Sequence, residues 1–166
     1  MKVLYIHGLH SNPNPLKLDI LEKLGLEVVS PFIDYEKEKA EVYKRVKKIA
    51  LEEKIDLMIG SSLGGFIAYW LSRDIDKAAL LFNPALYFES MKPFIPRLEK
   101  QHNTPIYVCL GEKDSQVNPQ EVRKYLSEQT KNHHNTKIMM TSWLAHGIDL
   151  KTFKTITAWF LSEEGL

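Results

Sequence analysis

This chain of 166 residues has little cysteine, almost no net charge and no long apolar run. Cys109 is the one cysteine, so no disulfide can form within the chain, which suits a reducing compartment. The 22 basic and 21 acidic side chains leave a net charge of +1, which gives no electrostatic reason to expect nucleic acid or an anionic membrane as a partner. No run of about 18 apolar residues is available to span a bilayer.

A signal peptide is not expected either, because the chain starts almost directly on the apolar run Val3–Ile6. The hydrophobic fraction of 44% and the charged fraction of 26% are those of an ordinary soluble protein. We therefore expect a cytoplasmic protein with one domain over residues 1–166, long enough to bury a core. The oligomeric state cannot be deduced from these numbers.

Short apolar runs alternate with longer amphipathic ones along the whole chain. The apolar runs predict strands at 2–7, 26–30, 56–60, 77–82, 105–110 and 136–142. The amphipathic runs predict helices at 14–24, 36–54, 63–73, 92–101, 119–130 and 150–162. This alternation indicates an α/β protein with a mainly parallel sheet, whose ligands bind beyond the carboxyl ends of the strands.

The segment after the third predicted strand reads "GSSLGG" and contains two adjacent serines. A nucleophile elbow has the pattern G-x-S-x-G, because its sharp turn has no room for side chains at the flanking positions. Gly60 and Gly64 stand two residues on either side of Ser62, whereas Ser61 would be flanked by Ile59 and Leu63. The sequence therefore selects Ser62 as the candidate nucleophile.

Asp114 and His146 each follow a later predicted strand, in the chain order Ser, Asp, His that this motif requires. An imidazole accepts the proton of the serine hydroxyl during attack, and a carboxylate orients and stabilises that imidazole. Asp149 and Glu112 are rival acids, although Asp149 more readily caps the last helix. The oxyanion that forms during attack needs two N–H donors, for which we expect the backbone of Leu63 and of Leu9.

Other ligand sites find little support in the sequence. The segment "GSSLGG" lacks the lysine of a phosphate-binding loop, and "HGLH" after the first strand is not a dinucleotide fingerprint. His133 and His134 have no further ligands at a spacing that suits a metal. We therefore expect neither a cofactor nor a metal.

The segments "YIHGLHSNP", "GSSLGGFIAYWL", "LLFNPAL", "GEKDSQV" and "AHGID" resemble the α/β-hydrolase superfamily across essentially the whole chain. They are most similar to the small bacterial YqiA/YcfP-type predicted esterases. The resemblance implies a minimal α/β-hydrolase fold, and hydrolysis of carboxylic esters or thioesters through an acyl-enzyme, without a cofactor. The superfamily's acid commonly lies in a Gly-x-x-Asp segment, which Gly111 and Asp114 match, and its histidine precedes a small residue, as His146 precedes Gly147.

The chain departs from the superfamily pattern in two ways. It begins at the strand that carries His-Gly, so the usual antiparallel strands at the N-terminus are absent and six strands remain, for which we expect the order 2-1-3-4-5-6. There is also no large lid, because only residues 83–104 have room for a cap over the site. The candidate residues for lining a pocket are His10, Tyr87, Phe88 and Trp143.

The sequence thus predicts a serine hydrolase that acts on small-molecule esters or thioesters with small or medium acyl groups. A small amidase or peptidase with the same three residues is an alternative, and so is a binding module that has the hydrolase fold but no activity. Acyl chain length, leaving group and pathway are not encoded in a pattern of this kind.

Overall fold

The computed structural model describes residues 1–98, 103–129 and 135–165, and its centre is a six-stranded sheet. Neighbouring strands all pair in parallel, in the order β2-β1-β3-β4-β5-β6. The strands are β1 (Lys2–Ile6), β2 (Glu27–Val29), β3 (Leu57–Ser61), β4 (Ala78–Phe82), β5 (Ile106–Gly111) and β6 (Thr136–Thr141). The predicted strands and their predicted order are confirmed.

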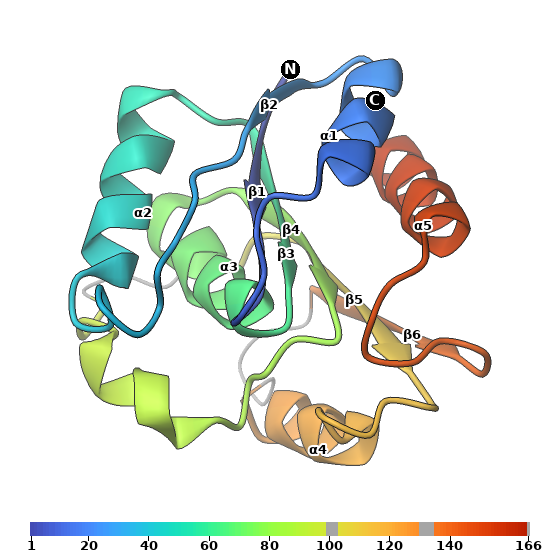
Figure 1. Ribbon diagram of the computed structural model, residues 1–166. Coiled ribbons are helices and arrows are strands. Elements are labelled where there is room, and N and C mark those ends of the chain that lie inside the picture. The colour runs from blue at the N-terminus through green and yellow to red at the C-terminus, as the bar shows by residue number, and fades with distance from the viewer. Residues whose placement is uncertain (99–102, 130–134, 166) are drawn as a thin grey trace.

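Helices cover both faces of this sheet, so the fold has three layers (Figure 1). The five α-helices in the described residues are α1 (Pro15–Lys23), α2 (Val42–Glu52), α3 (Leu63–Ile75), α4 (Pro119–Gln129) and α5 (Leu150–Glu163). Helices α1 and α5 lie side by side on one face, and α2, α3 and α4 contribute to the core on the other. Within the described residues, no helix is both long enough and apolar enough to cross a membrane.

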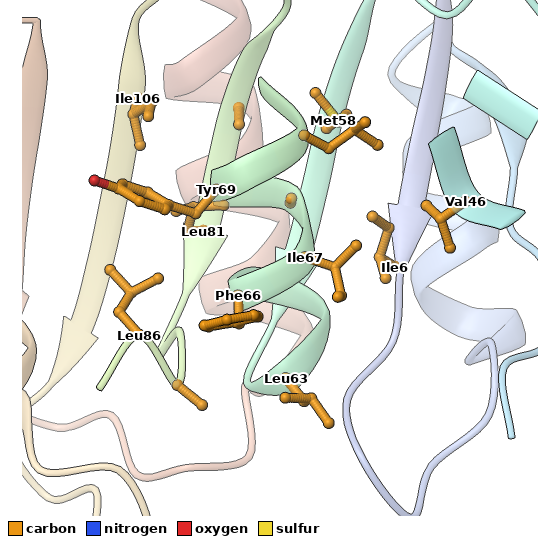
Figure 2. Packing of buried hydrophobic residues seen from close by; sticks show 14 of the residues in the cluster. Ile6, Val46, Met58, Leu63, Phe66, Ile67, Tyr69, Leu81, Leu86 and Ile106 are labelled. Carbon is orange, nitrogen blue, oxygen red and sulfur yellow. The ribbon is translucent and has the colours of Figure 1, made fainter. Parts of the chain in front are cut away.

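The four central strands, β1, β3, β4 and β5, are nearly continuous apolar runs because both of their faces are buried. Along β4, Leu81 points into the core shared with α2, α3 and α4, whereas its neighbours Leu80 and Phe82 point into the core shared with α1 and α5. Figure 2 shows Leu81 on the first of these faces together with Ile67 of α3 and other buried side chains. Alternate residues of each strand thus hold opposite layers in place.

The prediction of a helix over 92–101 is wrong for the residues that the structure describes. The chain instead forms a short 3-10 helix, η1 (Glu89–Phe94), and continues without helix to residue 98. Pro93 and Pro96 lack the backbone N–H groups that a continuous α-helix needs, and their rings clash with the preceding turn. The described part of 83–104 therefore holds no large lid, as expected.

The predicted helix over 36–54 is shorter than its pattern suggested. Helix α2 begins only at Val42, because residues 36–41 form turns. The side chain of Glu38 is engaged in this turn, since its carboxylate accepts a hydrogen bond from the backbone N–H of Asp34. Side-chain hydrogen bonds of this kind stabilise the turn, so the helix begins later than periodicity alone indicated.

Leu81→Ala should lower the free energy of unfolding by about 2–5 kcal/mol, because Leu81 is fully buried and its removal leaves a cavity. Leu51→Ala on α2 is the matched control, since that leucine is 55% exposed and its loss should cost no more than about 0.5 kcal/mol. Urea unfolding followed by circular dichroism measures both values. Equal losses in the two variants would contradict the packing described for β4.

Candidate active site

Ser62 lies in a sharp turn between the end of β3 and the start of α3. Its backbone angles, φ 52° and ψ −119°, are strained for a residue with a side chain. Two backbone hydrogen bonds hold this conformation: the N–H of Ser62 donates to the carbonyl of Phe82, and the carbonyl of Ser62 accepts from the N–H of Ala85. The turn has the geometry of a nucleophile elbow.

The two glycines that flank Ser62 are required by close backbone contacts. A Cβ atom on Gly64 would lie 2.2 Å from the carbonyl oxygen of Ile6 at the end of β1. A Cβ atom on Gly60 would lie 2.5 Å from the carbonyl oxygen of Gly64 itself. Distances this short exclude any larger residue without a shift of the backbone, which is the steric reason that the pattern has glycine at both positions.

The buried Asp114 and the partly exposed His146 form a hydrogen-bonded pair. His146 Nδ1 lies 2.8 Å from Asp114 Oδ2, and the Asp114 side chain is 1% exposed while that of His146 is 19% exposed. The other carboxylate oxygen of Asp114 accepts the backbone N–H groups of Gln116 and Val117. With Nδ1–H donating to the carboxylate, Nε2 is the ring nitrogen left to accept a proton.

Asn83 fixes the loop that carries His146, a role that the sequence analysis did not assign to it. Its side-chain N–H₂ donates to the carbonyls of Ala145 and His146, and its side-chain oxygen accepts the N–H of Gly111. Asn83 is buried and has a positive φ of 43°, which asparagine tolerates better than most residues. An Asn-Pro pair after a strand is typical of a turn, and nothing in that local pattern points to these long-range bonds.

The loop after β1 passes directly beside Ser62. A Cβ atom on Gly8 would lie 3.1 Å from Ser62 Cβ and 3.7 Å from its Oγ, so the lack of a side chain allows this approach. Leu9, the expected second N–H donor, follows at once, and both Leu9 and Leu63 line the cavity that contains Ser62. Leu63 is the first residue of α3, where backbone N–H groups have no partner within the helix.

His7 is the buried anchor of this loop. Its Nδ1 lies 2.8 Å from the carbonyl oxygen of Gly8, and its Nε2 accepts the N–H of Ile33. The carbonyl of His7 accepts the hydroxyl of Tyr35. These partners fix a neutral ring with Nδ1 protonated, and burial lowers the pKa of His7.

A cavity of about 620 Å³ opens beside Ser62 and His146, within the size range of small-molecule sites. Of the four side chains considered for its lining, His10 and Phe88 do line it. Tyr87 does not, because it turns toward a separate polar hollow where its hydroxyl accepts the N–H of Asn118. Trp143 does not either: it is 65% exposed, and its ring N–H donates to Thr152 on α5.

The rival acids lie outside this arrangement. Asp149 caps α5, because its side chain accepts the N–H of Thr152, and Glu112 lines the polar hollow beside Tyr87. Cys109 is buried within β5, where burial raises the pKa of its thiol. His133 and His134 fall outside the described residues.

The sequence of residues 2–143 matches UPF0227, an uncharacterised protein family. This chain is a member of that family. The match spans every element from β1 through β6, so it includes Ser62 and Asp114, while His146 lies just beyond its end.

Several solved structures share this architecture. A protein of Xanthomonas campestris assigned to the α/β superfamily of hydrolases has a TM-score of 0.77 at 18% identity, over 98% of this chain and 97% of its own. The mouse α/β-hydrolase domain-containing protein 10 has a TM-score of 0.75 at 14% identity, over 98% and 88%. The Pyrococcus furiosus esterase Pf2001 has a TM-score of 0.72 at 17% identity, over 98% and 82%. The fold of this UPF0227 member is therefore the α/β-hydrolase fold, as the resemblance implied.

Gly64→Ala should lower the free energy of unfolding by about 3 kcal/mol, because the new methyl group would collide with the main chain of β1. Gly147→Ala is the matched control, since a Cβ atom there meets nothing within 4 Å, and we expect a change within about 1 kcal/mol. Thermal or urea unfolding measures both. A Gly64→Ala variant as stable as the control would refute the close contact.

The buried His7 should make stability depend on pH. Because its pKa is lower in the folded than in the unfolded protein, the unfolded state binds the extra proton first as pH falls. The contribution of neutral His7 to stability is complete above the pKa of the histidine in the unfolded protein, about 6.5. It is lost as pH falls from there toward the lower pKa of His7 in the folded protein. The free energy of unfolding should therefore fall less between pH 7 and pH 5 in His7→Asn than in the wild type. Parallel curves of this free energy against pH for the two proteins would contradict this role of His7.

Proposed function

We propose that this protein is a serine hydrolase that cleaves carboxylic esters or thioesters with small or medium acyl groups through an acyl-enzyme on Ser62. One observation carries the proposal. Ser62, at the strained elbow, and His146, hydrogen-bonded to the buried Asp114, line the same cavity. The likeness to solved hydrolase folds adds support, since one of them bears the name esterase.

In the proposed first half of the reaction, Ser62 Oγ attacks the carbonyl carbon of the substrate. His146 Nε2 takes the hydroxyl proton, and Asp114 stabilises the imidazolium that forms. The N–H groups of Leu63 and Leu9 stabilise the negative charge on the former carbonyl oxygen. The tetrahedral intermediate then collapses: its bond to the leaving oxygen or sulfur breaks, and His146 returns the proton to the departing alcohol or thiol.

Water completes the proposed cycle. His146 Nε2 removes a proton from a water molecule as its oxygen attacks the acyl carbon on Ser62. The second intermediate breaks the bond between acyl carbon and Ser62 Oγ, and the proton on His146 goes back to that oxygen. The products are one carboxylic acid and free Ser62, and each group required is a side chain or backbone N–H of this chain.

The size of the cavity supports small or medium acyl groups. A volume of about 620 Å³ must hold both the acyl group and part of the leaving group. Phe88 and Ala85, from the segment after β4, supply apolar surface at its edge. The described part of that segment adds only η1, which does not build a long enclosed tunnel for extended lipids.

Ser62→Ala should reduce kcat/KM for p-nitrophenyl butyrate by about 10⁴-fold or more and should abolish labelling by a fluorophosphonate probe, because no nucleophile remains. Ser61→Ala is the matched control at the adjacent position, and we expect it to keep labelling and most of the turnover. Turnover is followed by absorbance, and labelling by intact-protein mass spectrometry.

Two outcomes would overturn the proposal. Retained labelling and turnover in Ser62→Ala would show that the nucleophile is another residue. A wild-type protein that is never labelled and cleaves no ester or thioester would leave a binding module as the better description. Faster cleavage of a matched anilide than of the ester would replace the ester class with an amide one.

A further inference from the structure

A lysine belongs to the lining of the proposed active-site cavity. Lys17, on the first turn of α1, is only 9% exposed, although lysine is rarely buried this deeply without a partner. It lines the cavity that contains Ser62 and His146. In the part of the chain that the structure describes, no carboxylate lies within ion-pair distance of its ammonium group.

The described residues around Lys17 hold its side chain in place, but none of them forms an ion pair with its ammonium group. Its Nζ lies 5.3 Å from the centre of the Phe153 ring on α5, the helix that packs beside α1 in Figure 1. Burial lowers the pKa of the ammonium group, and the negative charge of Asp149 opposes that effect from a distance. Asp149 itself is engaged as the cap of α5, where Oδ1 accepts the N–H of Thr152.

The charge balance of the cavity favours an anion. The described residues that line it include Lys17 and no aspartate or glutamate. The nearby carboxylate of Asp114 is already engaged by His146 and by two backbone N–H groups. A buried cation without a counter-ion costs free energy, which a negatively charged ligand in the cavity would recover.

A purely structural role is the main competing explanation for this lysine. Lys17 and Leu21, one turn later, are the buried residues of α1, and an apolar side chain at position 17 would fill that buried position as well or better. The ammonium group is therefore the part of Lys17 that packing does not explain.

We propose that Lys17 binds an anionic substituent, a carboxylate or a phosphate, of the ester or thioester that occupies the cavity beside Ser62. This inference rests on the proposed function and narrows its substrate class to charged esters. The anion belongs either to the acyl part or to the leaving group, and the two arms of the test separate these sources.

Two matched pairs of substrates test the proposal. Monomethyl glutarate against methyl pentanoate varies the charge of the acyl part, and release of acid is followed with a pH indicator. Acetyl-4′-phosphopantetheine against acetyl-pantetheine varies the charge of the leaving group, and release of thiol is followed with a disulfide reagent. We expect the wild type to prefer the charged member of at least one pair by about tenfold or more in kcat/KM.

Lys17→Met keeps an unbranched apolar stem against Phe153 and removes the charge. It should abolish that preference, mainly by raising KM for the charged member, and Lys17→Arg should restore part of it. Lys23→Met on the same helix is the matched control, because Lys23 is exposed and paired with Asp19, and it should keep the preference unchanged.

Binding without turnover gives an independent readout. In a Ser62→Ala background, calorimetry should show monomethyl glutarate or acetyl-4′-phosphopantetheine binding about tenfold more weakly once Lys17→Met is added. Hydrolysis of the neutral esters without any preference for charge would overturn this inference and leave the proposed function intact. An equal loss for charged and neutral members in Lys17→Met would assign the lysine to packing. Absence of all Ser62-dependent hydrolysis, with no Lys17-dependent binding, would overturn both.

Discussion

The close packing of the first turn of α3 against the end of β1 is the contact on which the site depends. Gly64 brings this turn so near the carbonyl of Ile6 that no Cβ atom fits between them. The chain between β3 and α3 must then turn sharply, and Ser62 adopts a strained backbone conformation with a positive φ. The same contact sets the loop after β1 beside Ser62, since that loop starts one residue after Ile6. The candidate nucleophile and the expected oxyanion donors are thus placed by one steric constraint.

A second set of contacts joins the remaining loops to this turn. Ala85 donates to the carbonyl of Ser62, and Asn83, two residues earlier, bonds the loop of His146 and the end of β5. Asp114 lies a few residues beyond that end, in a turn whose N–H groups its own carboxylate accepts. Four loops that are far apart in the sequence therefore share a network of short hydrogen bonds. Such networks limit the motion of the groups that catalysis must hold in register.

The sequence predicted the parts of this molecule that depend on local pattern. Six apolar runs gave the strands, and G-x-S-x-G selected Ser62 over Ser61, because both signals arise from requirements at fixed spacing. Features that depend on distant partners were missed. Lys17 reads as an ordinary helix lysine until Phe153 and the cavity are in place, although its position one turn before the buried Leu21 was an available signal. The helix expected over 92–101 failed where two prolines outweighed periodicity.

The segment from Tyr87 to η1 has a consequence for how such proteins diversify. It contributes Phe88 to the cavity, yet the main-chain bonds that hold the elbow are made earlier, at Ala85. Changes in the length or composition of this stretch would reshape the cavity's edge without disturbing the contact at Gly64 or the bonds of Asn83. Substrate range and the proposed chemistry would then be separately variable in this fold, because they depend on different segments of the chain.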